Sequence, residues 1–454
     1  MSYSIEQEPV LVIGTGQPII FTAKESALSG SPKFKYICDV YINGTRKARL
    51  KQLPNASSVA VFDISRVVNS FLSSTKVNQG ITTNSIHTLP LGDTADPFSL
   101  NDSTLESVVC KFGYEKASSA TTAPVVTADV VTESTRYAIQ GAVPYIAGIN
   151  YAFGDFIPNG TSKRFLTNMP NNSVDGESIS VSNNEWRTIA FLNYSSATQI
   201  NRLYVQIYNS SDVLLNTSNF YFENTNANGG ANPSSEVSDD TERLIYAGIG
   251  VKNLNTQTLH TDMQISQHPT AAYYKVFGTD ASNNQKTAMY RFNLDGNDCI
   301  FPMVELAWKN RLGVWDYYTF KKKDEKRLSI TRTGMSKVFG TYNTATYSVN
   351  SFDRGGETLT TEAMFTASAN TDYMSEKQAQ WLQGCFTSNE VYLIDTTKDV
   401  FQTSSGATIS ADAPNVIPIE ITSAEFTEKT RINNQCEIQY TINYKYSKPQ
   451  RTGI

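Results

Sequence analysis

The sequence contains few of the residues from which catalytic and metal sites are usually built. Only three of its 454 residues are histidines: His87, His260 and His268. His260 and His268 have no acidic or thiol neighbours at the spacing that metal ligands require. We therefore expect these two histidines to lie in surface loops and no metal site to form.

Cysteines are also sparse, and their arrangement excludes the usual structural roles. There are five, which is an odd number, and none forms a CxxC pair. Neither a disulfide framework nor a zinc site is expected from such scattered positions, so buried free thiols are the simpler interpretation. The five residues are Cys38, Cys110, Cys299, Cys385 and Cys436.

Charged residues make up 18% of the chain, and the net charge is -5. A nucleic-acid-binding face requires clustered basic residues. The one basic run, residues 321–327, is interrupted by Asp324 and Glu325 and is expected to be a solvated end of a hairpin. We therefore expect no nucleic-acid partner.

Long apolar stretches are missing. The N-terminal residues MSYSIEQEPVLVIGTG lack both a basic segment and an apolar run, so we expect no signal peptide. No run approaches the roughly 18 apolar residues of a transmembrane helix. The sequence therefore predicts no membrane partner, and synthesis in a reducing cytoplasm.

Recognisable catalytic and cofactor motifs are absent from the sequence as well. It has no GxSxG elbow and no HExxH. The segment Gly14-Thr15-Gly16 lacks the third glycine of a dinucleotide loop. Residues 293–298, NLDGND, are similar to a calcium loop, but Val304 stands where the bidentate glutamate should be, so this segment is expected to turn two strands.

No catalytic, cofactor-binding or metal-ligating residue is therefore proposed, and we expect neither a cofactor nor enzymatic activity. Paired carboxylates for glycoside hydrolysis need only meet in space, and this alternative stays open. No self-similar repeat at a fixed period is visible.

What the chain does have is the composition of a β protein. Asn, Ser and Thr are abundant and aromatic residues reach 11%, which is typical of strands with polar, uncharged surfaces. We predict a mainly β fold made of several β-sandwich-like domains with a few short helices.

The most informative stretch runs from Cys299 to Phe320. Val304, Leu306 and Trp308 recur at every second position, which is the period of a strand with one buried face. Gly313 follows a short polar connection, and residues 314–320 are rich in aromatics. The pattern predicts a packed hairpin, with a stacking platform for sugars or bases as the alternative.

Residues 1–123 are predicted to form an N-terminal β domain with one short helix. Asn43-Gly44 indicates a type I′ turn in the hairpin 36–50. Asp63 is positioned to cap a helix whose apolar residues fall within 64–72. Residues 116–123 are interpreted as a surface loop or hinge.

Three further segments complete the predicted domain plan. Residues 137–223 are expected to form a central β-sandwich-like domain, residues 224–243 a linker, and residues 244–454 a C-terminal β domain. That domain has one helix near 375–386, with Ser375 and Gln378 as a capping box.

Several strands are predicted in the last 110 residues. Residues 436–446 alternate between apolar and polar positions, which indicates a long strand with one wet face. Its expected antiparallel neighbour is 420–430, reached through residues 431–434, and 345–352 is a further strand candidate.

Several phrases, taken together and in this order, resemble a group of virion structural proteins of tailed bacteriophages. The Asn-x-x-Gly-x-x-Asp turn from Asn310 to Asp316 is the most specific of these features. No residue role is transferred with the resemblance. The phrases are FKYICDVYINGTRKARLK, VFDISRVVNSFL, KRFLTNMP, IYAGIGVKNL, ELAWKNRLGVWDYYTF, SEKQAQWLQGCFTSNEVYLI and EKTRINNQCEIQYTINYKY.

The resemblance implies a non-enzymatic component of the tail, baseplate, collar or fibre anchor. Its partners would be further copies of itself and other virion proteins, and it would be assembled into the virion in the cytoplasm of the bacterial host. One alternative is a receptor- or carbohydrate-binding decoration protein, in which Trp186 stacks on a host glycan instead of packing in a strand. The other is a polysaccharide-degrading tail enzyme.

Overall fold

The computed structural model describes residues 3–25, 27–72, 87, 98–100, 104–142, 153–192, 199–218, 220–224, 244–257, 260–295, 301–341, 344–395, 415–423, 425–429, 438–448 and 451–453. These residues are mainly β, with three α-helices among them, which confirms the predicted fold class. The chain divides into two compact units. The first includes Met1–Asn297 and Lys309–Tyr317, and the second includes Asp298–Trp308, Tyr318–Lys398 and Asn415–Ile454.

The N-terminal part of the first unit is a β-sandwich of two sheets. The smaller sheet has the order β1 (Ser4–Gln7), β3 (Ile20–Lys24), β6 (Val59–Asp63). The larger has the order β2 (Val12–Gly14), β10 (Arg136–Ile139), β8 (Leu105–Lys116), β4 (Lys35–Ile42), β5 (Thr45–Gln52), with β9 (Val125–Thr132) also paired to β8.

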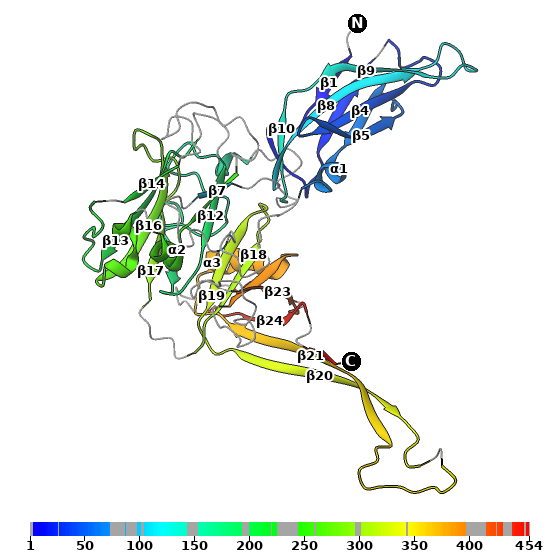
Figure 1. Ribbon diagram of the computed structural model, residues 1–454. Coiled ribbons are helices and arrows are strands. Elements are labelled where there is room, and N and C mark those ends of the chain that lie inside the picture. The colour runs from blue at the N-terminus through cyan, green and yellow to red at the C-terminus, as the bar shows by residue number, and fades with distance from the viewer. Residues whose placement is uncertain are drawn as a thin grey trace. The chain divides into compact units, whose positions relative to one another are not determined.

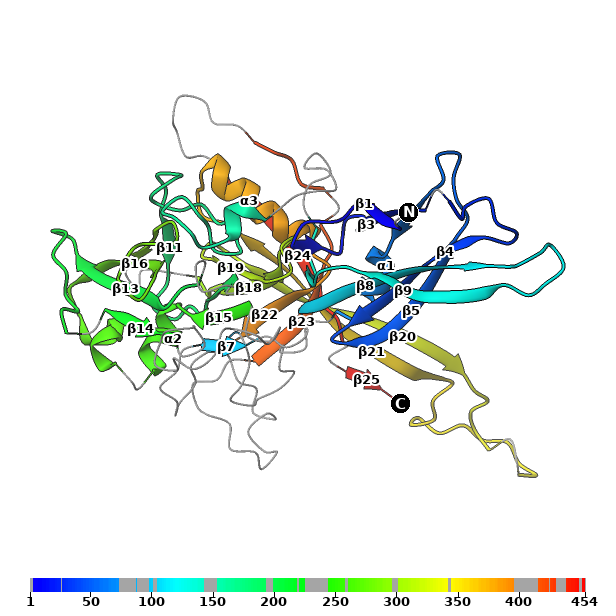
Figure 2. The same ribbon diagram turned by 90° about the horizontal axis from the view of Figure 1, so that it is seen from above.

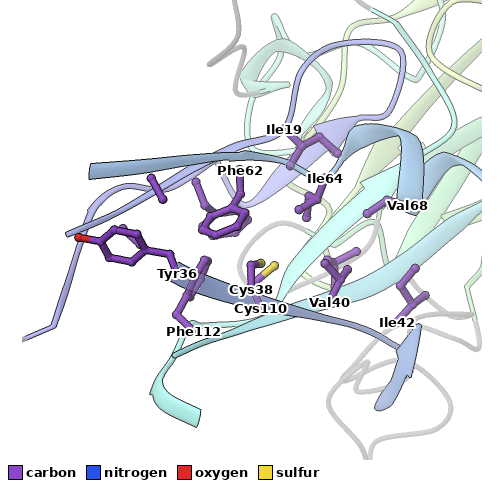
Figure 3. Close-up of a cluster of buried hydrophobic side chains, with 14 of the residues drawn as sticks. Ile19, Tyr36, Cys38, Val40, Ile42, Phe62, Ile64, Val68, Cys110 and Phe112 are labelled. Atoms are coloured by element: carbon purple, nitrogen blue, oxygen red, sulfur yellow. The ribbon is translucent and has the colours of Figure 1, made fainter. Parts of the chain in front are cut away.

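The core of this sandwich fills the space between the two sheets (Figure 3). Phe21 of the small sheet lies 5.4 Å, between ring centroids, from Phe112 of the large one, and Phe62 lies 6.0 Å from the same ring. Cys38 and Cys110 are buried here as free thiols, as the sequence predicted. Cys385 is also a buried free thiol, whereas Cys299 and Cys436 lie outside the described residues.

The β4–β5 hairpin has the predicted turn. Asn43 and Gly44 both have positive φ angles, 47° and 71°, as a type I′ turn requires. The short helix is also present, as α1 (Ser65–Asn69), and its N-cap residue is Ile64, one position after the predicted Asp63. Asp63 accepts hydrogen bonds from the amides of Ile19 and Ser65.

Residues 116–123, interpreted as a surface loop or hinge, connect two paired strands of one sheet. β8 and β9 are antiparallel on either side of them, with Lys116 opposite Val125. β10 then pairs with β8 as well. The sandwich therefore continues past residue 123 to Ile139.

The middle of the first unit contains two more sheets. One has the order β11 (Ile179–Val181), β17 (Tyr290–Leu294), β16 (Ala271–Thr279), β13 (Arg202–Asn209), β14 (Tyr221–Glu223). The other has the order β12 (Thr188–Leu192), β15 (Leu244–Gly248), β7 (Phe98–Leu100). The helix α2 (Val251–Thr256) and the short 3-10 helices Gly154–Phe156, Thr261–Met263 and Ile265–Gln267 accompany them.

These two sheets combine strands from both sides of the predicted linker. β13 precedes residues 224–243 and pairs with β16, which follows them, and β12 pairs with β15 in the same way. Most of the linker, residues 225–243, lies outside the described residues. The predicted domain boundary at residues 224–243 therefore separates strands that pair with each other in the same sheets.

Most of an eight-stranded sheet belongs to the second unit, whereas residues 309 and 315–317 of its strands belong to the first. Its order is β19 (Trp315–Phe320), β18 (Val304–Lys309), β22 (Val391–Asp395), β23 (Asn415–Ile421), β24 (Thr441–Tyr446), β21 (Gly356–Asn370), β20 (Glu325–Ser336), with β25 (Arg451–Gly453) also paired to β21. The predicted hairpin of residues 304–320 is thus present as β18 and β19. The predicted helix is α3 (Glu376–Thr387), and Ser375 and Gln378 form its capping box.

The alternation predicted for the last strand is confirmed for its described residues. Ile438, Tyr440, Ile442 and Tyr444 are buried, while Thr441 and Asn443 are exposed. The strand itself is shorter than predicted, and it pairs with β23 through Ile419 opposite Tyr446. Residues 430–437, including the predicted connection 431–434, lie outside the described residues, and the strand predicted at 345–352 was wrong.

Candidate functional site

The least covered part of the described structure is a two-stranded ribbon that we call the arm. It consists of β20, β21 and the segment between them, residues 337–355, which we call the tip (Figure 1). All twelve residues of β20 are exposed, and only the inner half of β21 is partly buried. The arm extends beyond the other strands of its sheet, so it presents surface on both faces.

Residues of the arm favour strands because they are rich in threonine and contain no proline in either strand. β20 and β21 are antiparallel from Glu325 opposite Ser368 to Ser336 opposite Gly356. A bulge falls between Thr333 and Gly334. Beyond the three residues that pair with β25, the ribbon has two strands only among the described residues (Figure 2).

A row of apolar side chains crosses the eight-stranded sheet on one face and reaches the arm. Directly paired residues share a face, so the register fixes the row. Strand pairing connects all neighbouring members of the row except Tyr446 and Phe365, whose ring centroids lie 5.5 Å apart. In order across the sheet the members are Trp308, Val391, Ile419, Tyr446, Phe365 and Leu328.

Burial decreases along this row. Trp308 is fully buried, because Trp381 of α3 lies 5.3 Å from its ring. At the other end Leu328 is 46% exposed, and Ile330, two residues further along β20, is 44% exposed. The apolar face that α3 covers at one side of the sheet therefore continues onto the arm. There the Lys326 ammonium lies over the rings of Phe365 and Tyr446, while Leu328 and Ile330 stay exposed.

The tip adds a second apolar surface. Five of its large side chains are exposed by 42–78%, and Phe352 is the most exposed of them. Apolar residues gathered in this way at an exposed loop are typical of interaction surfaces. The five residues are Val338, Phe339, Tyr347, Val349 and Phe352.

The tip is held together by its own contacts. The hydroxyl of Tyr347 donates to the carbonyl of Phe339 at 3.0 Å, and the amide of Thr341 donates to Ser348 at 3.0 Å. Gly340 has a φ angle of 84°, and a Cβ atom there would meet the ring of Tyr347 at 3.0 Å. The exposed aromatic residues are thus presented on a defined scaffold.

Charges on the arm are mostly paired within the chain. Lys337 pairs with Glu357, and Glu325 pairs with both Lys323 and Arg327 at 3.3 and 3.2 Å. The basic run 321–327 is therefore compensated locally. Lys321 differs from the prediction because it is buried rather than solvated.

A shallow polar depression lies at the base of the arm. Its volume is about 230 Å³, and its lining includes Glu325, Arg327 and Asn443. The hydrogen bonds from Lys323 and Arg327 hold the pKa of Glu325 below its usual range. The charged side chains that line this depression, Glu325 and Arg327, already form an ion pair with each other.

The three histidines do not come together. His87 is fully buried, and its Nδ1 lies 2.7 Å from the hydroxyl of Tyr317, which is also 2.7 Å from the Oγ1 of Thr188. Burial lowers the pKa of His87 to about 3. His268 contacts the carbonyl of Asp262 at 2.7 Å, and no group of three metal-ligating side chains occurs in the part of the chain that the structure describes.

The aromatic residues weighed as stacking platforms are core residues. Trp186 is 0% exposed, which corrects the alternative that it stacks on a glycan. In the central hairpin, Trp308 and Trp315 are buried too, as the packed-hairpin interpretation predicted.

Two other sequence segments have structural explanations. The amides of Thr15 and Gly16 donate to the carbonyls of Ile139 and Gly141 at 3.0 and 2.7 Å. Asp295 of the NLDGND segment accepts from Ser180, and residues 296–298 lie outside the described residues. Among the described helices, none has the length and apolar character needed to cross a bilayer.

Neither a scan against protein-family models nor a search of curated proteins finds a match to this chain.

Proposed function

We propose that this chain is a structural component of a tailed bacteriophage particle, of the tail, baseplate, collar or fibre-anchoring type, and that it acts by protein–protein assembly. The resemblance of its sequence phrases to virion proteins supplies the kind of particle. The exposed apolar arm supplies the means of assembly and is the observation that carries the proposal.

The physical argument starts from the cost of leaving apolar surface in water. Burying apolar area contributes roughly 25 cal/mol per Å². Single exposed apolar residues are common, but a gathered set on a projecting ribbon marks an interaction site. Phe352, at 78% exposure, and Val338, at 66%, would gain most from a protein partner.

The proposal is tested by finding the chain in particles. Virions purified through a density gradient and treated with protease and nuclease are analysed by mass spectrometry, with an abundant host cytoplasmic protein as the control. We expect peptides of this chain at a fixed ratio to the major capsid protein across gradient fractions. Their absence, or a ratio that follows the host control, would refute the proposal.

A further inference from the structure

The outer edge of β20 is open. β20 is the last strand of its sheet and pairs with β21 alone among the described strands. Natural edge strands are usually short or protected by proline and inward-pointing charges. β20 has twelve residues and no proline. Its charged residues are Glu325, Lys326, Arg327 and Arg332, and its bulge falls between Thr333 and Gly334, so residues 328–331 are the unprotected part of the edge.

We propose that β20 pairs antiparallel with β20 of a second copy, joining two eight-stranded sheets edge to edge across a two-fold axis. An unpaired row of backbone amides and carbonyls is a template for strand addition, and an identical antiparallel strand is its self-complementary partner. This inference deepens the proposed function, on which it rests, by naming the surface and the partner.

The side chains of β20 favour one register for this pairing. A two-fold axis perpendicular to the sheet keeps each face on its own side, so opposed residues must have the same parity. With Leu328 on the axis, Arg332 stands opposite Asp324 of the other copy, an opposite-charge pair. With Ser329 on the axis, Lys326 would stand opposite Arg332, and these like charges repel.

The Leu328 register also continues the apolar row. Phe365 and Leu328 are opposed in one copy, so Leu328 and Phe365 of the second copy follow directly across the axis. The row that begins under α3 of one sheet would then end under α3 of the other. Leu328, 46% exposed in the single chain, would lie at its centre.

The antiparallel arrangement brings each tip to the base of the opposite arm. Tyr373, close to that base, is 58% exposed. Phe339, Tyr347 and Phe352 expose about 350 Å² between them if each ring side chain is taken as about 200 Å².

The flank of β20 adds to this area. In the Leu328 register residues 325–331 of the two copies face each other, so the paired flank is about 23 Å long and about 10 Å deep and adds about 230 Å². The two contributions come to about 580 Å² per partner, the size of a small interface, so the dimer is expected to be weak.

The test uses the full-length chain and measures its mass by sedimentation over a range of concentrations. We expect the wild type to form a dimer and Leu328→Lys and Ile330→Lys to be monomeric, because both place a cation in the pairing edge. Leu359→Lys is the matched control: Leu359 is 53% exposed but lies on β21, so this variant should dimerise like the wild type.

Cysteine cross-linking then tests the register. In the proposed pairing the two Leu328 Cβ atoms lie about 5 Å apart, within reach of a disulfide after small adjustment. Leu328→Cys should cross-link to a dimer under a mild oxidant. Ser329→Cys should do so far less, because in this register each Ser329 stands opposite Arg327, and not opposite Ser329, of the other copy.

The following outcomes would overturn the inference: a wild type that stays monomeric, equal loss of dimer in Leu328→Lys and Leu359→Lys, or stronger cross-linking at position 329. A monomer that floats with phosphatidylcholine vesicles would instead identify the arm as a membrane surface. Each of these leaves the proposed function intact if the chain is found in purified particles, and absence from particles leaves a measured dimer intact.

Discussion

At the scale of single residues, Gly313 is the position where the backbone tolerates least change. Its φ angle is 83°, and a Cβ atom there would collide with the carbonyl of Gln140. We expect Gly313→Ala to lower the free energy of unfolding by about 3 kcal/mol or more, from backbone strain together with the collision. Chemical denaturation measures this.

Gly44 provides the control, because it has a similar φ angle of 71° but no atom within 4 Å of a built Cβ. Gly44→Ala should cost about 1–2 kcal/mol, from strain alone. Equal losses in the two variants would contradict the role assigned to the Gln140 carbonyl.

His87 makes the stability of the first unit depend on pH. Its pKa is about 3 in the fold, against 6.5 ordinarily, so between these values the unfolded chain binds one more proton than the folded one. The free energy of unfolding therefore falls as pH falls through this window, by about 2 kcal/mol between pH 7 and pH 5 from this group.

Denaturation at the two pH values, compared between wild type and His87→Asn, isolates this contribution. The variant keeps a polar group near Tyr317 but does not titrate, so it should lack that part of the loss. An imidazole NMR signal that reports a charged His87 in the folded wild type at pH 5 would contradict the prediction, whether or not the variant folds.

Residue-level features were predictable from sequence where they depend on local geometry. Asn43-Gly44 adopts the predicted turn because two adjacent residues determine it. The environment of His87 was not predictable, because its hydrogen-bond partner Tyr317 is 230 residues away in sequence. Trp186 could be weighed either way, since an aromatic residue fits a core and an exposed platform equally well.

At the scale of elements, the arm is the part that sequence patterns missed. Strand recognition depends on apolar residues at every second position, which arise when one face is buried. Neither face of β20 is buried, so within residues 325–336 only Leu328 and Ile330 follow this alternation, which is too short to predict a strand. α3 and the last strand were predicted because each has one buried face that imposes its period.

The tip is expected to be dispensable for folding. Ser336 lies opposite Gly356, so a two-residue Asn-Gly turn can replace residues 337–355 and close the same hairpin. We expect the melting temperature of this variant to match that of the wild type and its binding of a hydrophobic dye to fall. A lower melting temperature would show instead that the tip stabilises its own chain.

At the scale of the whole molecule, the first unit is not contiguous in sequence. Residues 309–317 belong to it although they follow Asn297 only after a segment of the second unit. They supply Asp316, which accepts from Thr167 at 2.6 Å, and Asn310, which donates to the carbonyl of Leu166 at 3.0 Å.

Fragments should reflect this arrangement. All strands of the N-terminal sandwich lie within residues 4–139, so residues 1–142 should fold alone with a cooperative melt. Residues 1–297 lack 309–317, so this fragment should show only the transition of the N-terminal sandwich. Its residues after 142 should not fold cooperatively, and the fragment should be poorly soluble. Circular dichroism and NMR dispersion measure both, and a 1–297 fragment as well ordered as the whole chain would contradict the expectation.

The late position of residues 309–317 also sets an order of events during translation. The strands of the N-terminal sandwich are complete once Ile139 has left the ribosome, and those of the middle sheets once Leu294 has, but residues 309–317, which contact Thr167 and Leu166, follow only later. At about 5–20 residues per second, the stretch from Asn297 to Tyr317 alone takes about 1–4 s to synthesise. Throughout that interval the nascent chain lacks residues that complete the first unit, which is when a chaperone would help it most.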